Sequence, residues 1–208
     1  GGNLNRGKFI SLEGIDGSGK TTLKEKLADY LSSKYELLIV REPGGTEISE
    51  KIRGMLLDIR NDGMMAGTEA FLYAAARSQL VEELIRPALA AGKIVIADRY
   101  MDSTIAYQGY GRGLNIKFLQ ELNILCTAGV EPDLTLLLDI DPREGQRRRQ
   151  KDIPDRLEKE GIDFQSRIRS GYLQIQQQEP ERIKLLNAGS SIQELYEEAL
   201  KYIVGILD

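Results

Sequence analysis

The chain has 208 residues, a formal net charge of −4 and a hydrophobic fraction of 41%. This length fits one domain with a sizeable core, and the acidic balance argues against a general nucleic-acid binder, which needs a basic surface. The lack of histidine excludes serine–histidine and histidine–zinc chemistry, and the single cysteine excludes a disulfide framework or a multi-cysteine metal site.

Five short apolar runs alternate with longer stretches of helical periodicity. The runs hold few charges, as strands buried on both faces should, and predict strands at residues 8–13, 36–41, 93–98, 134–140 and 182–187. Helices are predicted at residues 20–33, 46–58, 68–91, 116–128, 143–151, 163–178 and 191–206. This alternation predicts an α/β fold with a parallel sheet covered on both faces, and ligands of such sheets bind beyond the carboxyl ends of the strands.

The segment between the first predicted strand and the first predicted helix is rich in glycine. Residues 14–21 read GIDGSGKT and match the pattern G-x-x-x-x-G-K-[ST] in the strand-to-helix context that gives it meaning. Its backbone N–H groups can converge on phosphate oxygens at the helix N-terminus. We expect Lys20 to reach the β- and γ-phosphates of a nucleoside triphosphate and the Thr21 hydroxyl to bind Mg²⁺. A glycine-rich turn with a solvated lysine is the alternative.

Other motifs narrow the class of phosphate-loop protein. The sequence has no N-K-x-D motif, as a GTPase would, and no L-S-G-G-Q-like motif, as a transporter ATPase would. A small nucleotide or nucleoside kinase remains. Such an enzyme needs a second anion site opposite the loop and a cationic lid, because two polyanions must meet away from water.

Two arginines are candidates for that second anion site. Arg99 directly follows the third predicted strand and therefore lies at the carboxyl edge of the sheet. Arg77 lies on a largely apolar helix, and its i±4 neighbours, Tyr73 and Val81, cannot pair with it. An unpaired guanidinium favours a bound anion, although an ion pair with a carboxylate from elsewhere is the structural alternative.

The nearby aromatic and amide residues allow two interpretations. Phe71, on the same helix as Arg77, is either a core residue or a platform for a stacked base. Tyr107 and Gln108 follow Arg99 and could form an ordinary helix end or line a ligand pocket. The residue types alone leave both alternatives open.

Residues 143–159 read REGQRRRQKDIPDRLEK, with seven basic and four acidic residues in an acidic protein. A charged stretch is usually a solvated helix face. The phosphate loop, however, has no arginine at residues 15–18, and phosphoryl transfer needs cations around the transferred group. A lid that supplies arginine in cis is therefore the better interpretation.

These motifs together resemble the thymidylate kinase family of the bacterial type. The matching stretches are FISLEGIDGSGKTTL, REPGGTEISEKIR, ADRYMDSTIAYQGYGRG, EPDLTLLLDIDP, RRRQKDIPDRLE and LNAGSSIQEL, in the expected order. The conjunction of D-R-Y with S-x-x-A-Y-Q-G is far more specific than the phosphate loop alone. The resemblance implies a three-layer P-loop NTPase fold with a five-stranded parallel sheet, in one domain over residues 1–208, with an arginine-rich lid at about 143–159.

The resemblance also implies an activity. The chain is expected to transfer the γ-phosphoryl group of ATP to dTMP, giving dTDP and ADP, with Mg²⁺ as cofactor. A cytoplasmic homodimer without a nucleic-acid or membrane partner is expected. A related kinase for another nucleotide or a deoxynucleoside, and a non-catalytic nucleotide-binding regulator, are the alternatives.

The family's roles transfer to this sequence residue by residue. ATP is expected to contact the phosphate loop and an adenine-binding loop, namely Gly14, Asp16, Gly17, Ser18, Gly19, Lys20, Thr21, Thr22, Asn187 and Ala188. dTMP is expected to contact Asp16, Arg53, Phe71, Arg77, Arg99, Ser103, Tyr107 and Gln108, with Phe71 stacked on the base. Catalytic roles are expected for Asp16, Lys20, Arg99 and the lid arginines Arg147, Arg148, Arg149 and Arg156, without a choice among those four. Thr21 and Asp98 are the expected residues at the metal.

Overall fold

The structure, a computed structural model, describes residues 6–149 and 153–208. A five-stranded parallel sheet with the order β2-β3-β1-β4-β5 lies at its centre. The strands are β1 (Phe9–Glu13), β2 (Leu37–Arg41), β3 (Ile94–Asp98), β4 (Leu134–Asp139) and β5 (Ile183–Asn187). The predicted α/β fold is confirmed, and each strand begins and ends within one residue of its predicted bounds.

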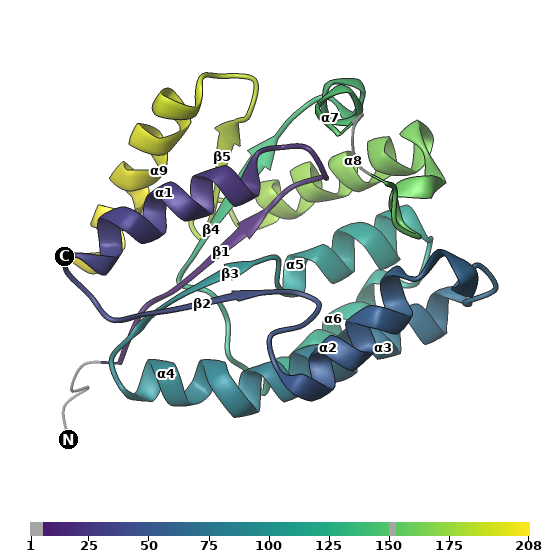
Figure 1. Cartoon of the computed structure of the whole chain (residues 1–208), viewed down its shortest axis with the longest axis horizontal. Helices are drawn as coiled ribbons and strands as arrows, with labels where there is room; N and C mark the ends of the chain where they lie inside the picture. Colours follow the sequence, from purple (N-terminus) through teal and green to yellow (C-terminus); the bar gives the residue numbers. More distant parts are fainter. Residues whose placement is uncertain (1–5, 150–152) are drawn as a thin grey trace.

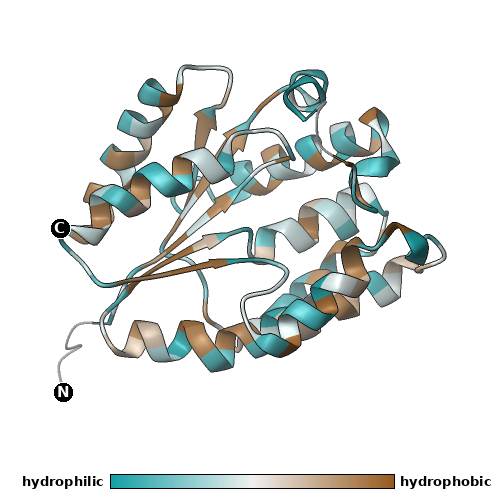
Figure 2. Cartoon of the chain, viewed as in Figure 1, coloured by the Kyte–Doolittle hydropathy of each residue, from teal (hydrophilic) through white to brown (hydrophobic). Residues whose placement is uncertain are grey.

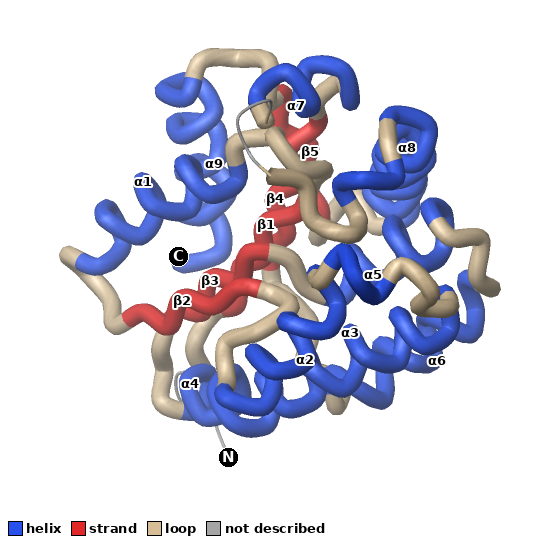
Figure 3. Tube along the Cα trace, turned by 45° about the vertical axis from the view of Figure 1, so that its right-hand side comes forward, coloured by secondary structure: helices blue, strands red, loops and turns tan. Residues whose placement is uncertain are grey.

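Helices cover both faces of this sheet. On one face lie α1 (Lys20–Ser32) and α9 (Ile192–Leu207), and on the other α3 (Ala66–Leu80), α4 (Arg86–Ala90) and α8 (Ile162–Gln178). Figure 1 shows the twisted sheet between these layers, and Figure 3 shows α1 and α9 apart from the larger helical layer. The remaining helices and turns are α2 (Glu47–Leu57), η1 (Ile59–Asn61), η2 (Val81–Ile85), α5 (Met101–Thr104), η3 (Ile105–Gly111), α6 (Ile116–Thr127), α7 (Pro142–Arg148) and η4 (Glu158–Glu160).

The central strands form the core because they are apolar on both faces. All five residues of β1 are buried, and in β4 only the last residue, Asp139, is not fully buried. Figure 2 shows hydrophobic residues along the strands and hydrophobic residues alternating with hydrophilic ones along the helices. The buried hydroxyls of Ser11 and Thr135 hydrogen-bond each other at 2.7 Å across β1 and β4, so neither polar group is left without a partner.

Two helical regions differ from the expectation. The helix predicted at 68–91 begins slightly earlier, as α3, and runs through the π-helical turn η2 into α4. No helix was predicted at residues 101–111, apart from a possible helix end at Tyr107 and Gln108, but these residues form α5 and η3, where the Arg112 N–H donates to the Tyr107 carbonyl at 2.9 Å. Because Gly109, Gly111 and Gly113 disfavour a helix, the sequence pattern here indicates a loop, whereas tertiary packing against α8 stabilises a π-helix. Such turns are frequent at functional sites.

The helix in the lid region is shorter than the sequence pattern predicts. The helix predicted at 143–151 is α7, which ends at Arg148, and the last predicted residues, 150 and 151, lie outside the described part of the chain. Pro142 occupies the first turn of α7, and the Asp141 side chain accepts a hydrogen bond from the Arg143 N–H at 2.8 Å as its N-cap. Among the described helices, none combines the length and the apolar character needed to cross a membrane.

Candidate active site

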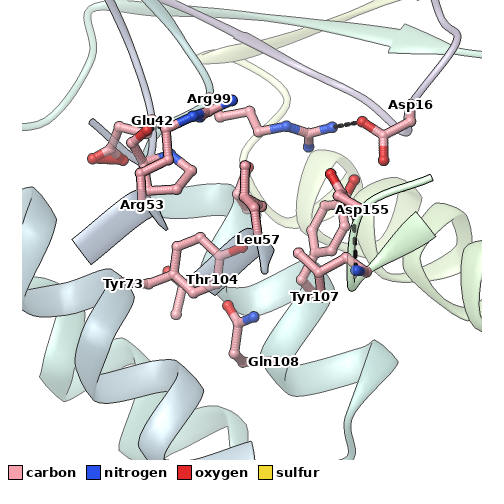
Figure 4. Close-up of a pocket in the computed structure, with 13 residues that line it drawn as sticks. Asp16, Glu42, Arg53, Leu57, Tyr73, Arg99, Thr104, Tyr107, Gln108 and Asp155 are labelled. Carbon is pink, nitrogen blue, oxygen red and sulfur yellow. Dashed lines mark hydrogen bonds and ion pairs between the residues drawn. The ribbon is translucent and has the colours of Figure 1, made fainter. Parts of the chain in front are cut away.

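Two adjoining cavities lie beyond the carboxyl ends of β1 and β3. The first, here called the loop cavity, is lined by Asp16, Gly17, Gly19, Lys20, Thr21, Thr22, Arg41, Glu42, Arg53, Asp98, Arg99, Arg148, Arg149 and Glu158. The second, here called the inner cavity and drawn in Figure 4, is lined by Asp16, Glu42, Pro43, Arg53, Leu57, Tyr73, Arg99, Ser103, Thr104, Tyr107, Gln108, Asp155 and Leu157. Four residues, Asp16, Glu42, Arg53 and Arg99, line both. Ligands in the two cavities would therefore meet at these residues.

The loop between β1 and α1 needs its glycines. Gly14, Gly17 and Gly19 have φ angles of 143°, 81° and 91°, which side-chain-bearing residues rarely adopt. A Cβ on Gly17 would also lie 2.2 Å from the carbonyl oxygen of Gly145 in α7. Gly14 and the buried Ser18 do not line the loop cavity themselves, so they act on its shape through the backbone.

Lys20 is the first residue of α1 and is only 7% exposed. Its Nζ donates to the carbonyl oxygens of Gly14 at 3.0 Å and Ile15 at 3.3 Å. Burial, followed by the charge of Arg99, lowers the pKa of Lys20 to about 8. A polyphosphate in the loop cavity would favour the ammonium form, so the site is suited to a multiply charged anion.

Asp16 and Arg99 form an ion pair at the junction of the two cavities, with 2.9 Å between Oδ1 and Nη2 (Figure 4). Burial opposes ionisation of Asp16, but Arg99, Lys20 and Arg149 hold its pKa below the ordinary value. Arg99 has a φ angle of 72°, unusual for a residue other than glycine, and its guanidinium lies 4.9 Å from the centre of the Tyr107 ring. The backbone thus turns sharply after β3 to direct this cation into the site.

A second cation lies on the α2 side of the same junction. Arg53 lines both cavities, and its Nη1 donates to the Pro43 carbonyl at 2.8 Å. Burial, followed by the charge of Arg41, lowers the pKa of Arg53. Arg53 and Arg99 thus both lie where the two cavities meet, and two guanidinium groups there would suit an anion.

The deeper part of the inner cavity is aromatic and polar. Figure 4 shows Tyr73, Thr104 and Gln108 around one space, with Tyr107 beside it. Among the described residues, the buried Tyr107 hydroxyl has no hydrogen-bond partner. Such a pocket fits a planar ring with polar edges.

Phe71 does not line this pocket, although the resemblance implies that it stacks on the base. Its side chain is 57% exposed and packs edge-on against Phe118, with 5.9 Å between the ring centres. Tyr73 lines the pocket instead. Tyr73 is four residues before Arg77, so helical spacing places those two on one face, whereas Phe71 is two residues further back. This helical spacing was the sequence feature that could have pointed to Tyr73 instead of Phe71.

Arg77, which was also expected to contact dTMP, lines neither cavity. It is 1% exposed and pairs with Glu42 at 2.6 Å. Its remaining N–H groups donate to Thr104, Asn123 and the Tyr100 carbonyl at 2.8, 3.0 and 3.0 Å. The structural alternative, an ion pair with a carboxylate from elsewhere, is what the structure shows. Arg77 thus fixes two residues of the inner cavity, Glu42 and Thr104, from behind.

The four lid arginines separate into two groups. Arg148 and Arg149 line the loop cavity. The Arg147 side chain is 67% exposed and pairs with Glu144 on its own helix. Arg156 is buried, and its guanidinium binds Glu69 and, at 2.6 Å, the Leu56 carbonyl. Of the four candidates, Arg148 and Arg149 thus line the loop cavity, and Arg147 and Arg156 do not.

Asn187 and Ala188 follow β5 and do not line the loop cavity. The Asn187 side chain accepts a hydrogen bond from the Gly189 N–H at 2.9 Å, which shapes the turn. The Ala188 carbonyl accepts one from Arg148 Nη2 at 3.0 Å. Arg148 therefore connects this turn to the loop cavity.

Comparisons with known proteins agree with this geometry. A family model described as thymidylate kinase matches residues 12–199. The chain belongs to the thymidylate kinase family. A thymidylate kinase of Desulforudis audaxviator is 50% identical over 184 residues, covering 88% of this chain and 83% of the relative. A thymidylate kinase of Thermoanaerobacter sp. (strain X514) is 44% identical over 199 residues, covering 95% of this chain and 98% of the relative. The crystal structure of thymidylate kinase from Ehrlichia chaffeensis has a TM-score of 0.78 and 34% identity, covering 95% of this chain and 98% of that one.

The residues expected at the metal fit a cation that is shared with phosphates. Thr21 and Asp98 line the loop cavity, and the Asp98 carboxylate lies 3.5 Å from Lys24 Nζ. Mg²⁺ prefers a few protein oxygens together with substrate phosphates and water. Among the described residues, no group of three or more acidic, cysteine or histidine side chains is placed so that it could hold a metal ion.

Glu13 was not among the site residues predicted from the sequence, although it supports the site of this thymidylate kinase family member. It ends β1, is 1% exposed, and accepts hydrogen bonds from the Tyr100 N–H, Ser103 Oγ and Tyr172 Oη at 2.8, 2.6 and 2.7 Å. Ser103 lines the inner cavity, so Glu13 fixes a site residue. Burial, followed by the charge of Asp102, raises the pKa of Glu13 to about 7. The sequence feature that could have indicated this role is a single acidic residue at the end of an apolar strand.

This pKa predicts a pH dependence of stability. The folded state keeps a proton on Glu13 that the unfolded state releases above its ordinary pKa of 4.5, so this group makes the protein less stable as pH rises from 4.5 to about 7. We expect the difference in unfolding temperature, Glu13→Gln minus the unchanged chain, to be more positive at pH 8 than at pH 5. The exposed Glu82→Gln serves as control. An equal difference at both pH values would contradict the prediction.

Proposed function

We infer that the chain carries out the reaction of its family and transfers the γ-phosphoryl group of ATP to dTMP, giving dTDP and ADP. One observation supports this most strongly. The loop cavity and the inner cavity share the Asp16–Arg99 pair and Arg53. A donor phosphate on Lys20 and an acceptor phosphate on Arg99 would therefore face each other, which is the geometric requirement for direct transfer.

ATP is assigned to the loop cavity. The backbone N–H groups of the phosphate loop and Lys20 would hold the β- and γ-phosphates. Arg149 from the lid faces the same space, and Arg148 reaches toward the turn at Ala188, where the adenine is expected. Thr21 and Asp98 would hold Mg²⁺, which supplies positive charge to the phosphate oxygens when it is bound.

dTMP is assigned to the inner cavity. Its phosphate would lie on Arg53 and Arg99, and its base against Tyr73 and Gln108 at the closed end. The Tyr107 ring would pack beneath the deoxyribose, as the family resemblance implies. Phe71 has no part in this assignment, since its side chain lies outside the cavity.

The chemistry needs no general base. A phosphate monoester has its second pKa near 6, so the acceptor is a dianion at neutral pH. Catalysis then consists of placing two polyanions in contact and neutralising charge around the transferred group. Lys20, Arg99 and Arg149 are among the cations that line the loop cavity and could do this, and Asp16 would keep Arg99 oriented.

The proposed function is tested by measuring ADP release from ATP with dTMP, dUMP, UMP, CMP and deoxynucleosides as acceptors. We expect turnover with dTMP that exceeds the turnover with every ribonucleotide. Preference for another acceptor would assign the chain to a related kinase. Absence of transfer to all of them would favour a nucleotide-binding regulator.

An apolar face on α2, α3 and α6 supports the expected homodimer. These helices lie side by side in Figure 1. Phe71 contacts Phe118, and Leu125 follows Phe118 by two turns on the same face of α6. Leu125 is 77% exposed, and Ile48 and Met55 are exposed at the same spacing on α2. Exposed apolar side chains on three neighbouring helices favour a protein contact, and we assign this face to a second copy of the chain.

Light scattering after size-exclusion chromatography tests this assignment. We expect the unchanged chain to elute with the mass of a dimer and Leu125→Asp with that of a monomer, because a carboxylate would be buried against an apolar partner. Val204→Asp, at an exposed apolar residue of α9, is the matched control and should remain dimeric. A monomeric unchanged chain, or a dimeric Leu125→Asp, would refute the assignment.

A further inference from the structure

One buried carboxylate has no part in the roles assigned above. Glu69 lies on α3, is 1% exposed and lines neither cavity. Its Oε1 accepts hydrogen bonds from Gln108 Nε2 at 2.8 Å and Arg112 Nε at 3.2 Å. Its Oε2 accepts from Arg112 Nη2 at 3.1 Å and from Arg156 Nη2. A fully buried carboxylate with four donors is costly to assemble, and one of those donors belongs to the inner cavity.

The charge state of Glu69 decides what it can bind. Burial opposes its ionisation, but hydrogen bonds from Arg112 and Gln108 lower its pKa below the ordinary value. An ionised carboxylate only accepts hydrogen bonds. The side-chain amide of Gln108 can therefore face Glu69 only with its NH₂ group. This contact determines which end of the amide points away from Glu69.

The opposite end of that amide is turned toward the inner cavity. Gln108 lines the cavity, and Figure 4 shows its side chain reaching up between Tyr73 and Tyr107. Within the described residues, Gln108 Oε1 accepts no hydrogen bond. The backbone of the same residue is also held, since the N–H of Leu114, which follows η3, donates to the Gln108 carbonyl at 3.0 Å. Gln108 Oε1 is thus a hydrogen-bond acceptor with a fixed orientation toward the inner cavity.

An oriented acceptor distinguishes pyrimidines. Thymine and uracil have an N–H at ring position 3, which can donate to an amide oxygen, whereas cytosine has a bare acceptor nitrogen there. A free amide can rotate by 180° and suit either base, because its two ends are a donor and an acceptor of nearly equal shape. An amide pinned by a carboxylate suits only the base with the N–H.

We propose that Glu69 is a positioning residue for base selectivity: it pins the Gln108 amide with its oxygen toward the inner cavity and so favours a pyrimidine with N3–H over one without. This inference rests on the proposed function, because it takes the inner cavity as the site of the base. Glu69 itself touches no substrate. Its effect passes through Gln108 alone.

The test measures binding of dTMP and dCMP by calorimetry and turnover of dTMP with ATP. In Glu69→Gln the new amide can donate as well as accept, so the Gln108 amide is free to turn. We expect the ratio of dCMP to dTMP dissociation constants to fall about tenfold, the loss of roughly one oriented hydrogen bond. The KM for dTMP should rise, and kcat should stay within about threefold, because the cations around the transferred phosphate are unchanged.

A double-mutant cycle separates positioning from structural damage. In a Gln108→Met background, Glu69→Gln should leave the ratio unchanged, since the residue it acts through is gone. Glu82→Gln, on the exposed side of η2, is matched in charge and should keep the ratio of the unchanged chain. Unfolding temperature is followed in each variant, because Glu69→Gln also takes a charge from Arg112 and Arg156.

Glu69→Asp is the second variant. It keeps the negative charge for both arginines but shortens the side chain, so it withdraws from Gln108, and it should lower the ratio as well. A folded Glu69→Gln or Glu69→Asp with the original ratio would overturn the proposal, and so would a full effect of Glu69→Gln in the Gln108→Met background. If the unchanged chain does not use dTMP at all, the proposed function fails together with this inference.

Discussion

The Lys20→Met variant loses about 10²–10³-fold of kcat, the usual cost of removing one preorganised charge that acts on the reacting group. Methionine has a similar length and no charge, so it removes the cation and keeps the packing. The fold should survive, because burial already disfavours the ammonium, whose pKa is lowered to about 8. Unfolding temperature and steady-state turnover with ATP and dTMP check both parts.

Lys34→Met is the control for Lys20→Met. It makes the same change of charge at an exposed residue, whose Nζ donates to the Tyr30 hydroxyl at 3.0 Å and lies 4.7 Å from the centre of the same ring. It should retain the turnover of the unchanged chain. Near-normal turnover of Lys20→Met would show that the loop cavity does not hold the donor phosphates.

The Arg149→Ala variant is expected to lose about 10³-fold of kcat, the effect of removing an arginine that stabilises the transferred phosphoryl group. Arg149 lines the loop cavity, and Glu158 holds it at 2.7 Å. Its charge also contributes to the low pKa of Asp16, which places its field at the junction of the cavities. The affinity for ATP should change much less than kcat, because the phosphate loop and Lys20 remain.

Arg147→Ala is the matched control, two residues earlier in the same basic run. Its side chain is exposed and paired with Glu144, so kcat should remain within about twofold, as for most surface changes. Pre-steady-state kinetics separates phosphoryl transfer from product release in both variants. A large loss in Arg147→Ala together with full activity of Arg149→Ala would mean that the lid reacts in another arrangement.

The features predicted correctly from the sequence are those set by local pattern. The five strands are short and mostly apolar, and the three at the centre of the sheet, β1, β3 and β4, are buried along nearly their whole length, as the pattern of few charges predicts. The phosphate loop is a local backbone motif, so its residues and its position before α1 follow from spacing alone. Arg99 follows a strand directly, and the rule for parallel sheets places it at the ligand-binding edge.

The features that could not be predicted depend on contacts between distant segments. Arg77 pairs with Glu42, which is 35 residues away, and Arg156 pairs with Glu69, which is 87 residues away. Successive residues of a helix point about 100° apart, so a run of three arginines does not tell which one faces a cavity. Only the packing of α7 against the phosphate loop and α8 decides it.

The close approach of Gly17 to Gly145 restricts how transition-state charge can be supplied. A side chain at position 17 would collide with the α7 backbone, and a Cβ on Gly145 would lie 2.7 Å from the Asp16 carbonyl in return. Moving the arginine from the lid into the loop at this position would therefore require rerouting the lid helix. The two solutions are sterically incompatible on one backbone, so a chain that changes from one to the other must alter both segments together.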